Sequence, residues 1–338
     1  MQHFWSKRRL LDAMPGLRRA VGPQRLSLAL QGGGSFGAFT WGVLDRLLDD
    51  ETIGFDAASG ASAGAVNAVA LANGLAGGGR AAARECLARV WKRISLAAPV
   101  RSLGALGQSA ADSAVEVSTR LVSPYQFNPF DLNPLRQVLT EEIDFERLRR
   151  GSPLRLLIAA TRVKDGRLRI FRDHEITVDA VLASACLPSL HHAVEIDGEW
   201  YWDGGYSANP PLRQLILESA ARDIVLVQIT PAAREGLPRL PPDISRRVNQ
   251  IVFNGPLERE LEAIADLRRL CQGERVFRSR VCRKLRAVRL HRIAAEDRIE
   301  SLHEASATDL TWRFLKHLHK SGAEAAEDWL SEKAAGGL

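Results

Sequence analysis

The sequence predicts an α/β fold, a three-layer sandwich in which helices cover both faces of a mainly parallel central sheet. Short apolar runs typical of buried strands alternate with helical segments over residues 26–230. Glycine and proline turns separate these segments, and no internal repeat interrupts them. The chain has 338 residues, of which 46% are hydrophobic and 25% charged, so it can bury a full core.

The individual elements follow from periodicity and from capping residues. Gly77-Gly78-Gly79 should end one helix, and Thr177 should cap the start of another. Asp197-Gly198 should form the turn of a hairpin. Strands are predicted at residues 26–31, 55–59, 154–161, 168–171, 194–196, 199–201 and 224–230, and helices at 37–50, 63–76, 80–95, 177–185 and 211–220.

No clear boundary divides the chain into domains. We expect a basic N-terminal extension at residues 1–25 and one large domain at residues 26–338. Residues 97–134 are rich in Pro, Ser and Asn, which indicates a loop that could cover a site. The part from 240 to 338 is expected to be mainly helical, with a basic strand-like run at Lys284–Arg292 and final helices near 308–320 and 322–334.

Charge and cysteine content narrow the functional classes. Residues 1–25 hold six Lys or Arg against one Asp, and residues 271–292 hold eight against one Glu. Such runs are most often solvated surface, and attraction to an anionic membrane surface is the alternative. They lack interleaved aromatic residues and any nucleic-acid-binding module, so no nucleic-acid partner is expected. The four cysteines show no metal-ligand spacing, which predicts reduced thiols and no metal.

The N-terminal segment bears on location. It is basic but lacks the apolar core of a secretory signal, and no window approaches 18 consecutive apolar residues, so we expect a cytoplasmic protein. Trp5, Leu10, Leu11 and Met14 lie near basic residues, which would suit weak, peripheral contact with a membrane. A disordered basic tail is the simpler interpretation of the same residues.

Gly60-Ala61-Ser62-Ala63-Gly64 lies between a predicted strand and a predicted helix. A nucleophilic serine needs an exposed hydroxyl on a sharp turn, and small flanking residues make that turn possible. The Ala63 N–H and the helix N-terminus would face a developing oxyanion. The motif therefore predicts Ser62 as a catalytic nucleophile, whereas a plain Gly/Ser turn is the alternative.

A second glycine motif, Gly32-Gly33-Gly34-Ser35-Phe36-Gly37, also follows a strand and begins a helix. Its backbone N–H groups could complete an oxyanion hole. The spacing of Gly32, Gly34 and Gly37 also fits a dinucleotide-binding fingerprint. That alternative requires an acidic residue at the end of the next strand, and Asp56 lies too early in it. No cofactor is therefore expected.

The third motif is Asp203-Gly204-Gly205, which follows the predicted hairpin. By itself it could be a simple turn. As a general base, Asp203 would have to lie within hydrogen-bond reach of the Ser62 hydroxyl. Burial in a dry site would strengthen an otherwise weak base.

Together, in this order, the glycine loop, the GxSxG elbow and the DGG motif resemble the patatin-like phospholipase family. The resemblance covers residues 26–230 well and the C-terminal part more loosely. It implies a patatin-like variant of the α/β-hydrolase architecture. It also implies a serine lipid acyl hydrolase that forms an acyl-enzyme and needs no metal or cofactor.

Carried over to this chain, the resemblance implies a Ser62–Asp203 dyad with oxyanion donors from Gly32, Gly33, Gly34 and Ala63. Many members have Arg or Lys two places after the third loop glycine, and this chain has Phe36 there. The departure weakens the case for a phosphate-bearing lipid but leaves acyl-ester hydrolysis intact. Phe36 would either line an acyl pocket or pack in the core.

Two alternatives remain at this point. A Ser-His-Asp esterase would use His291 or His303, because both follow Asp203 in the α/β-hydrolase order. A non-catalytic lipid-binding protein would use the same pocket without turnover. The head group, the acyl chain and the oligomeric state are left open by the sequence.

Overall fold

The computed structural model describes residues 24–102, 123–233, 236–273, 279–299 and 307–335. Its centre is an eight-stranded sheet of order β5-β6-β3-β2-β1-β7-β8, in which β4 also pairs with β3. The strands are β1 Gln24–Leu30, β2 Ile53–Gly60, β3 Arg155–Arg162, β4 Leu168–Arg172, β5 Val194–Ile196, β6 Glu199–Asp203, β7 Asp223–Gln228 and β8 Arg289–Ala294.

The sheet is mainly parallel. Strands β3, β2, β1, β7 and β8 run in one direction, whereas β4, β5 and β6 are antiparallel to their neighbours. The carboxyl ends of the parallel strands therefore meet at one edge, where α/β proteins place their ligands.

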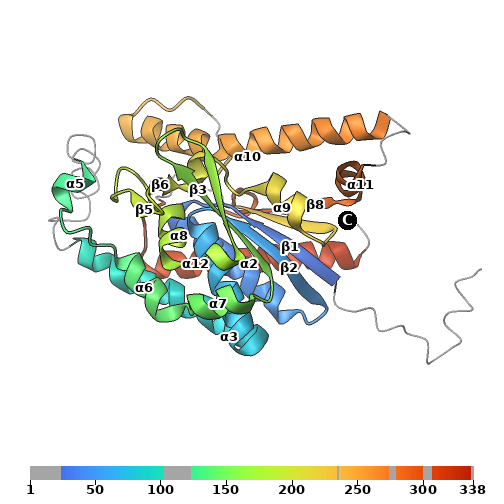
Figure 1. Cartoon of the computed structure of the whole chain (residues 1–338), viewed down its shortest axis with the longest axis horizontal. Helices are drawn as coiled ribbons and strands as arrows, with labels where there is room; N and C mark the ends of the chain where they lie inside the picture. Colours follow the sequence, from blue (N-terminus) through green and yellow to red (C-terminus); the bar gives the residue numbers. More distant parts are fainter. Residues whose placement is uncertain (1–23, 103–122, 234–235, 274–278, 300–306, 336–338) are drawn as a thin grey trace, which may run out of the picture.

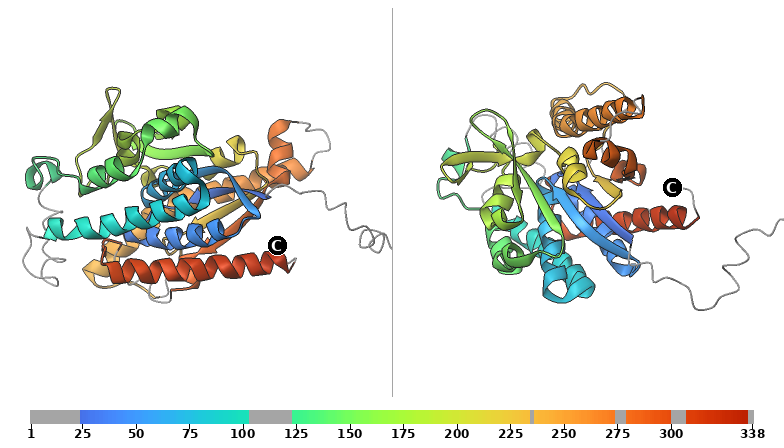
Figure 2. Two further views of the ribbon diagram at one scale, coloured as in Figure 1. Left: turned by 90° about the horizontal axis from the view of Figure 1, so that it is seen from below. Right: turned by 45° about the vertical axis from the view of Figure 1, so that its right-hand side comes forward.

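Helices cover both faces of this sheet (Figures 1 and 2). They are α2 Gly37–Asp49, α3 Ala63–Ser102, α5 Pro124–Phe127, α6 Pro134–Glu142, α7 Phe145–Gly151, α8 Val178–Ser184, α9 Leu212–Glu218, α10 Pro241–Gly273, α11 Arg280–Ala287 and α12 Trp312–Ala334. Single turns of 3₁₀ helix add η1 Gly34–Phe36, η2 Asp173–Glu175, η3 Gly204–Tyr206 and η4 Ala295–Asp297. In the described ranges, no helix combines the length and the apolar character needed to cross a membrane.

Two hydrophobic cores arise because successive residues of a strand point to opposite faces of the sheet. Leu28 and Leu30 of β1 belong to the core beneath α2, α3 and α12. Ala29, between them, belongs to the core beneath α9, α10 and α11. The predicted three-layer α/β architecture is thus confirmed.

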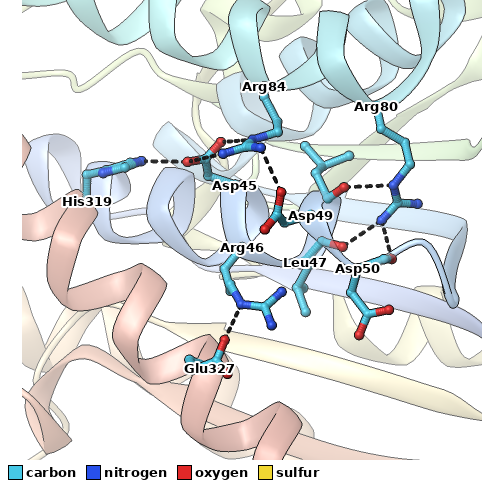
Figure 3. A network of polar contacts seen from close by, with 10 residues as sticks. Asp45, Arg46, Leu47, Asp49, Asp50, Arg80, Arg84, His319 and Glu327 are labelled. Atoms are coloured by element: carbon cyan, nitrogen blue, oxygen red, sulfur yellow. Dashed lines mark hydrogen bonds and ion pairs between the residues drawn. The ribbon is translucent and has the colours of Figure 1, made fainter.

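A polar network fastens α2 to α3 and α12 (Figure 3). Arg80 donates to the carbonyl oxygens of Leu47 and Leu48, both at 2.7 Å, and so caps the C-terminal end of α2. Asp45 accepts from Arg84 at 2.7 Å and pairs with His319 of α12 at 3.2 Å. The network fixes the end of this layer that lies away from the glycine loop.

Three predicted boundaries were wrong. The helix expected to end near residue 95 continues through Ser102. Within the basic run at Lys284–Arg292, residues up to Ala287 are helical because the Ser279 side chain caps α11 by accepting from the Cys282 N–H. Within that run, only residues from Arg289 onward form a strand.

The two final helices are one helix, α12. The helix continues through Gly322, because the absence of a side chain at this position lets α12 pack closely against α2. A Cβ there would lie 2.0 Å from the Phe39 carbonyl oxygen of α2. By contrast, the break at Gly77-Gly78-Gly79 is confirmed, since Gly79 has a φ of 74° and interrupts the helical backbone of α3.

Candidate active site

Ser62 lies on the sharp turn between β2 and α3, at the carboxyl edge of the sheet. Its φ is 53°, in the left-handed region that non-glycine residues rarely adopt. The turn is possible only because glycine stands two places before and two places after Ser62. A Cβ on Gly64 would lie 2.0 Å from the Leu30 carbonyl oxygen, and one on Gly60 would lie 2.5 Å from the Gly64 backbone.

Ser184, the last residue of α8, holds this turn in place. The Ser62 N–H donates to both the backbone oxygen and the Oγ of Ser184, each at 3.0 Å. The Ser62 amide is thereby occupied, and the hydroxyl is the group left to act. No motif in the sequence indicates this role of Ser184.

Asp203 ends β6 and is fully buried. Its Oδ1 accepts the Gly205 N–H at 2.8 Å, whereas Oδ2 has no hydrogen-bond partner among the described residues. Burial raises the pKa of Asp203 to about 7, and the Gly205 N–H and the Ser62 side chain oppose that shift. The Ser62 hydroxyl thus lies near this carboxylate without completing a hydrogen bond to Oδ2, as is common before substrate binds.

The glycine loop follows β1 and is held by Asn209, a fully buried side chain. The Gly32 N–H donates to Asn209 Oδ1 at 2.6 Å, and Asn209 Nδ2 donates back to the Gly32 oxygen at 3.1 Å. Because its only N–H is already donated, Gly32 is not an available oxyanion donor, which corrects the expectation for that residue. In the described part of the chain, the Gly33, Gly34 and Ala63 amides donate to no other residue.

Buried amide side chains anchor the base of the same loop. Gln31 Oε1 accepts the Ile229 and Thr230 N–H groups, both at 2.8 Å. Gln31 Nε2 donates to Asn254 Oδ1 of α10 at 2.9 Å, and Asn254 Nδ2 donates to the Pro231 oxygen at 2.7 Å. The loop is therefore rigidly tied to β7 and to α10.

Phe36 packs in the core. It is buried, and its ring meets the Phe314 ring edge-on at a centroid distance of 6.4 Å. Of the two roles considered for this residue, core packing is the one that the structure supports.

His291, one of the two histidines considered as alternatives, lies away from Ser62. His291 is on β8, and its Nε2 contacts Asp223 Oδ1 at 2.8 Å. Asp223 begins β7, at the opposite edge of the sheet from Ser62. His192 stacks on Tyr125 with ring centroids 4.1 Å apart. His303, most of the predicted cover at 97–134 and the basic N-terminal segment lie outside the described residues.

Comparisons with known proteins place this geometry in context. The family model for patatin-like phospholipase matches residues 28–216, which include all three motifs. No match was found among curated proteins. Among solved structures, VipD from Legionella pneumophila is 15% identical with a TM-score of 0.41, over 92% of this chain and 67% of VipD. The ExoU–SpcU complex from the type III secretion system of Pseudomonas aeruginosa is 18% identical with a TM-score of 0.28, over 71% of this chain and 52% of that chain.

The family match extends over more than half of the chain, from within β1 and through β6. The chain therefore belongs to the patatin-like phospholipase family and is a hydrolase of carboxylic esters in lipids.

Proposed function

We propose that the chain hydrolyses lipid acyl esters through a Ser62–Asp203 dyad. The observation that carries the proposal is the environment of Asp203, which is fully buried and has one carboxylate oxygen without a partner in the described part of the chain. A buried carboxylate without a nearby cation lowers the stability of the folded protein. A raised pKa makes the same carboxylate a better proton acceptor near neutral pH.

In the first half-reaction, Ser62 Oγ attacks the ester carbonyl carbon while its proton passes to Asp203. The carbonyl oxygen becomes an oxyanion, for which Gly33, Gly34 and Ala63 supply N–H donors. Collapse of this intermediate breaks the ester bond, and the leaving alcohol takes the proton from Asp203. The products are the free alcohol and an acyl group on Ser62.

In the second half-reaction, a water molecule attacks the acyl-enzyme and gives its proton to Asp203. A second oxyanion forms at the same donors. Its collapse releases the fatty acid, and Ser62 Oγ recovers the proton from Asp203. Every proton transfer uses the same carboxylate, so no histidine is required.

The lipid is expected to be a neutral ester or a phospholipid. Phe36, in the place where many family members carry a cation, is packed in the core and offers no charge to a phosphate. We therefore place recognition in the acyl ester and its chain.

Two alternative functions make different demands on the chain. A Ser-His-Asp esterase needs a histidine beside Ser62, whereas His291 is bound to Asp223 at the far edge of the sheet. A non-catalytic lipid-binding protein would have no need of a strained serine at the end of β2.

A soluble short-chain ester and a fluorophosphonate probe separate these functions. Wild type should hydrolyse the ester and be labelled, and Ser62→Ala should do neither. Asp203→Asn should reduce kcat/KM by about 10³-fold, the scale of a lost general base. His291→Gln and His303→Gln should stay within a few-fold of wild type.

Two results would contradict the dyad. One is activity retained in Asp203→Asn together with activity lost in a histidine variant, which would favour the triad. The other is wild-type Ser62 that remains unlabelled and turns over no ester, which would favour lipid binding without catalysis.

A further inference from the structure

The first half of α10 and the segment before it carry an exposed apolar stripe. On the helix, its residues recur at intervals of three or four positions and so share one face. The stripe consists of Leu237, Leu240, Ile244, Val248, Ile251 and Val252, all of them exposed. Single exposed apolar residues are ordinary, but four on one helix face, continued by two more just before the helix, mark an interaction surface.

The opposite side of the same helix is built into the candidate active site. The Phe253 ring packs on Tyr206 with centroids 5.2 Å apart, and it closes the space beside Gly205 of the DGG motif. The Phe253 carbonyl accepts from Asn209, which holds Gly32. The same helix thus carries the stripe and, through Phe253, contacts the residues that hold the glycine loop. Figure 1 shows α10 as one long helix along one side of the molecule.

The charges beside the stripe are mainly positive. The segment from 237 to 252 contains Arg239, Arg246 and Arg247 against Asp243 as its one acidic residue, and by helical spacing Arg246 lies on the side away from Ile244. Arg246 pairs with Asp243 at 3.3 Å, and Arg247 donates to the Ala232 carbonyl, while Arg239 is exposed. An apolar stripe in a segment of net positive charge is complementary to a lipid surface with anionic head groups.

We propose that this stripe docks the protein on anionic phospholipid bilayers. Lying in the plane of the interface, the first half of α10 would bring the turn of Asp203 and the glycine loop to the membrane, where the acyl ester resides. Delivery of the ester to the active site rests on the proposed function, whereas membrane binding by the stripe does not require hydrolysis.

Vesicle sedimentation tests the docking directly. The Ser62→Ala protein would be mixed with vesicles of phosphatidylcholine and phosphatidylglycerol, so that no lipid is consumed. Adding Ile244→Asp and Val248→Asp should weaken binding by about 100-fold, because two charges would enter the interface. Leu217→Asp on α9 is the matched control, since Leu217 is 45% exposed and Ile244 is 44% exposed. The control should bind as well as its parent.

A second readout uses the proteins with Ser62 intact. The Ile244→Asp/Val248→Asp protein should lose hydrolysis of vesicle lipid yet keep hydrolysis of a soluble ester within about twofold, which also shows that it is folded. If wild type hydrolyses neither substrate while binding still depends on the stripe, the proposed function fails and the docking surface stands.

Other outcomes would overturn the docking surface. Binding unchanged by the two aspartates but lost on deletion of residues 1–22 would assign the contact to the N-terminal segment. Equal loss in Leu217→Asp would show a general effect of added charge. A dimer in solution that the stripe variant dissociates, with vesicle binding unchanged, would make the stripe an interface between two copies of the chain.

Discussion

Two aspartates lie buried at opposite edges of the same sheet, and their surroundings differ completely. Asp223 begins β7 and is 3% exposed, and Asp203 ends β6 and is 0% exposed. Both carboxylates therefore lose nearly all contact with water. The two aspartates differ in the hydrogen-bond donors and positive charges that surround each carboxylate.

Asp223 is fully compensated. Arg289 donates to it at 2.7 and 2.6 Å, Gln24 donates at 2.8 Å and His291 lies at 2.8 Å. Burial alone would raise the pKa of this group, but the arginine, the histidine and the glutamine outweigh it and hold the pKa far below its ordinary value. The carboxylate stays charged at any pH at which the protein is used, so its role is structural.

Among the described residues Asp203 receives one backbone N–H and no cation, so burial prevails and its pKa rises to about 7. An acid left in this state can accept and release a proton near neutral pH. Both carboxylates have little solvent exposure, and the unequal set of partners around them separates a structural carboxylate from a candidate catalytic one.

Exchanging each aspartate for asparagine should produce opposite effects at pH 8. Asp203→Asn should lower kcat/KM by about 10³-fold, whereas Asp223→Asn should stay within a few-fold of wild type. The free energy of unfolding should fall by about 3 kcal/mol in Asp223→Asn, because Arg289 and His291 lose a charged partner. Kinetics on a soluble ester and urea unfolding measure the two quantities.

The stability of Asp203→Asn should be unchanged or higher. A raised native pKa means that the buried charge destabilises the fold above pH 7, and removing that charge can return up to about 4 kcal/mol. Loss of activity in Asp223→Asn equal to that in Asp203→Asn would break the comparison.

Asn209 tests the Ser62 end of the sheet further, because its side-chain amide holds the glycine loop in position. Asn209→Ala should reduce kcat and the rate of fluorophosphonate labelling by about 10- to 100-fold, because the N–H groups of the glycine loop would no longer be held in position to bind the oxyanion. KM for a soluble ester should change little.

Asn73→Ala is the matched control for Asn209→Ala. Asn73 is also buried, and it donates to the Glu142 oxygen and accepts from the Asp144 N–H, both at 3.0 Å, away from the glycine loop. Both variants should lose about 2 kcal/mol of stability. Equal labelling rates in the two would show that Asn209 is only structural.

The parts of the fold that follow from short-range patterns could be predicted from the sequence. β1 could be recognised from Leu26–Gln31, and the turn at Ser62 from the small residues around it. The order of the strands could not, because β1 pairs with β7 across nearly 200 residues. The final helix was predicted as two, near 308–320 and 322–334, because the sequence around Gly322 does not reveal that this glycine packs against Phe39 of α2.

The candidate site divides in the same way. Ser62 and Asp203 stand in local motifs and could be predicted. Asn209, Ser184 and Gln31 could not, because each acts through a partner far away in the sequence, such as Gly32 for Asn209. The signal that was present is an amide or hydroxyl group next to a motif, as in Gln31 directly before the glycine loop.

The pH dependence of kcat/KM on a soluble ester tests the central claim most directly. Only the ionised Asp203 can accept the Ser62 proton, so kcat/KM should rise with pH through a single ionisation near pH 7 and then level off. The same profile should be found in His291→Gln and His303→Gln. A profile whose midpoint moves or disappears in either histidine variant would contradict the Ser62–Asp203 dyad.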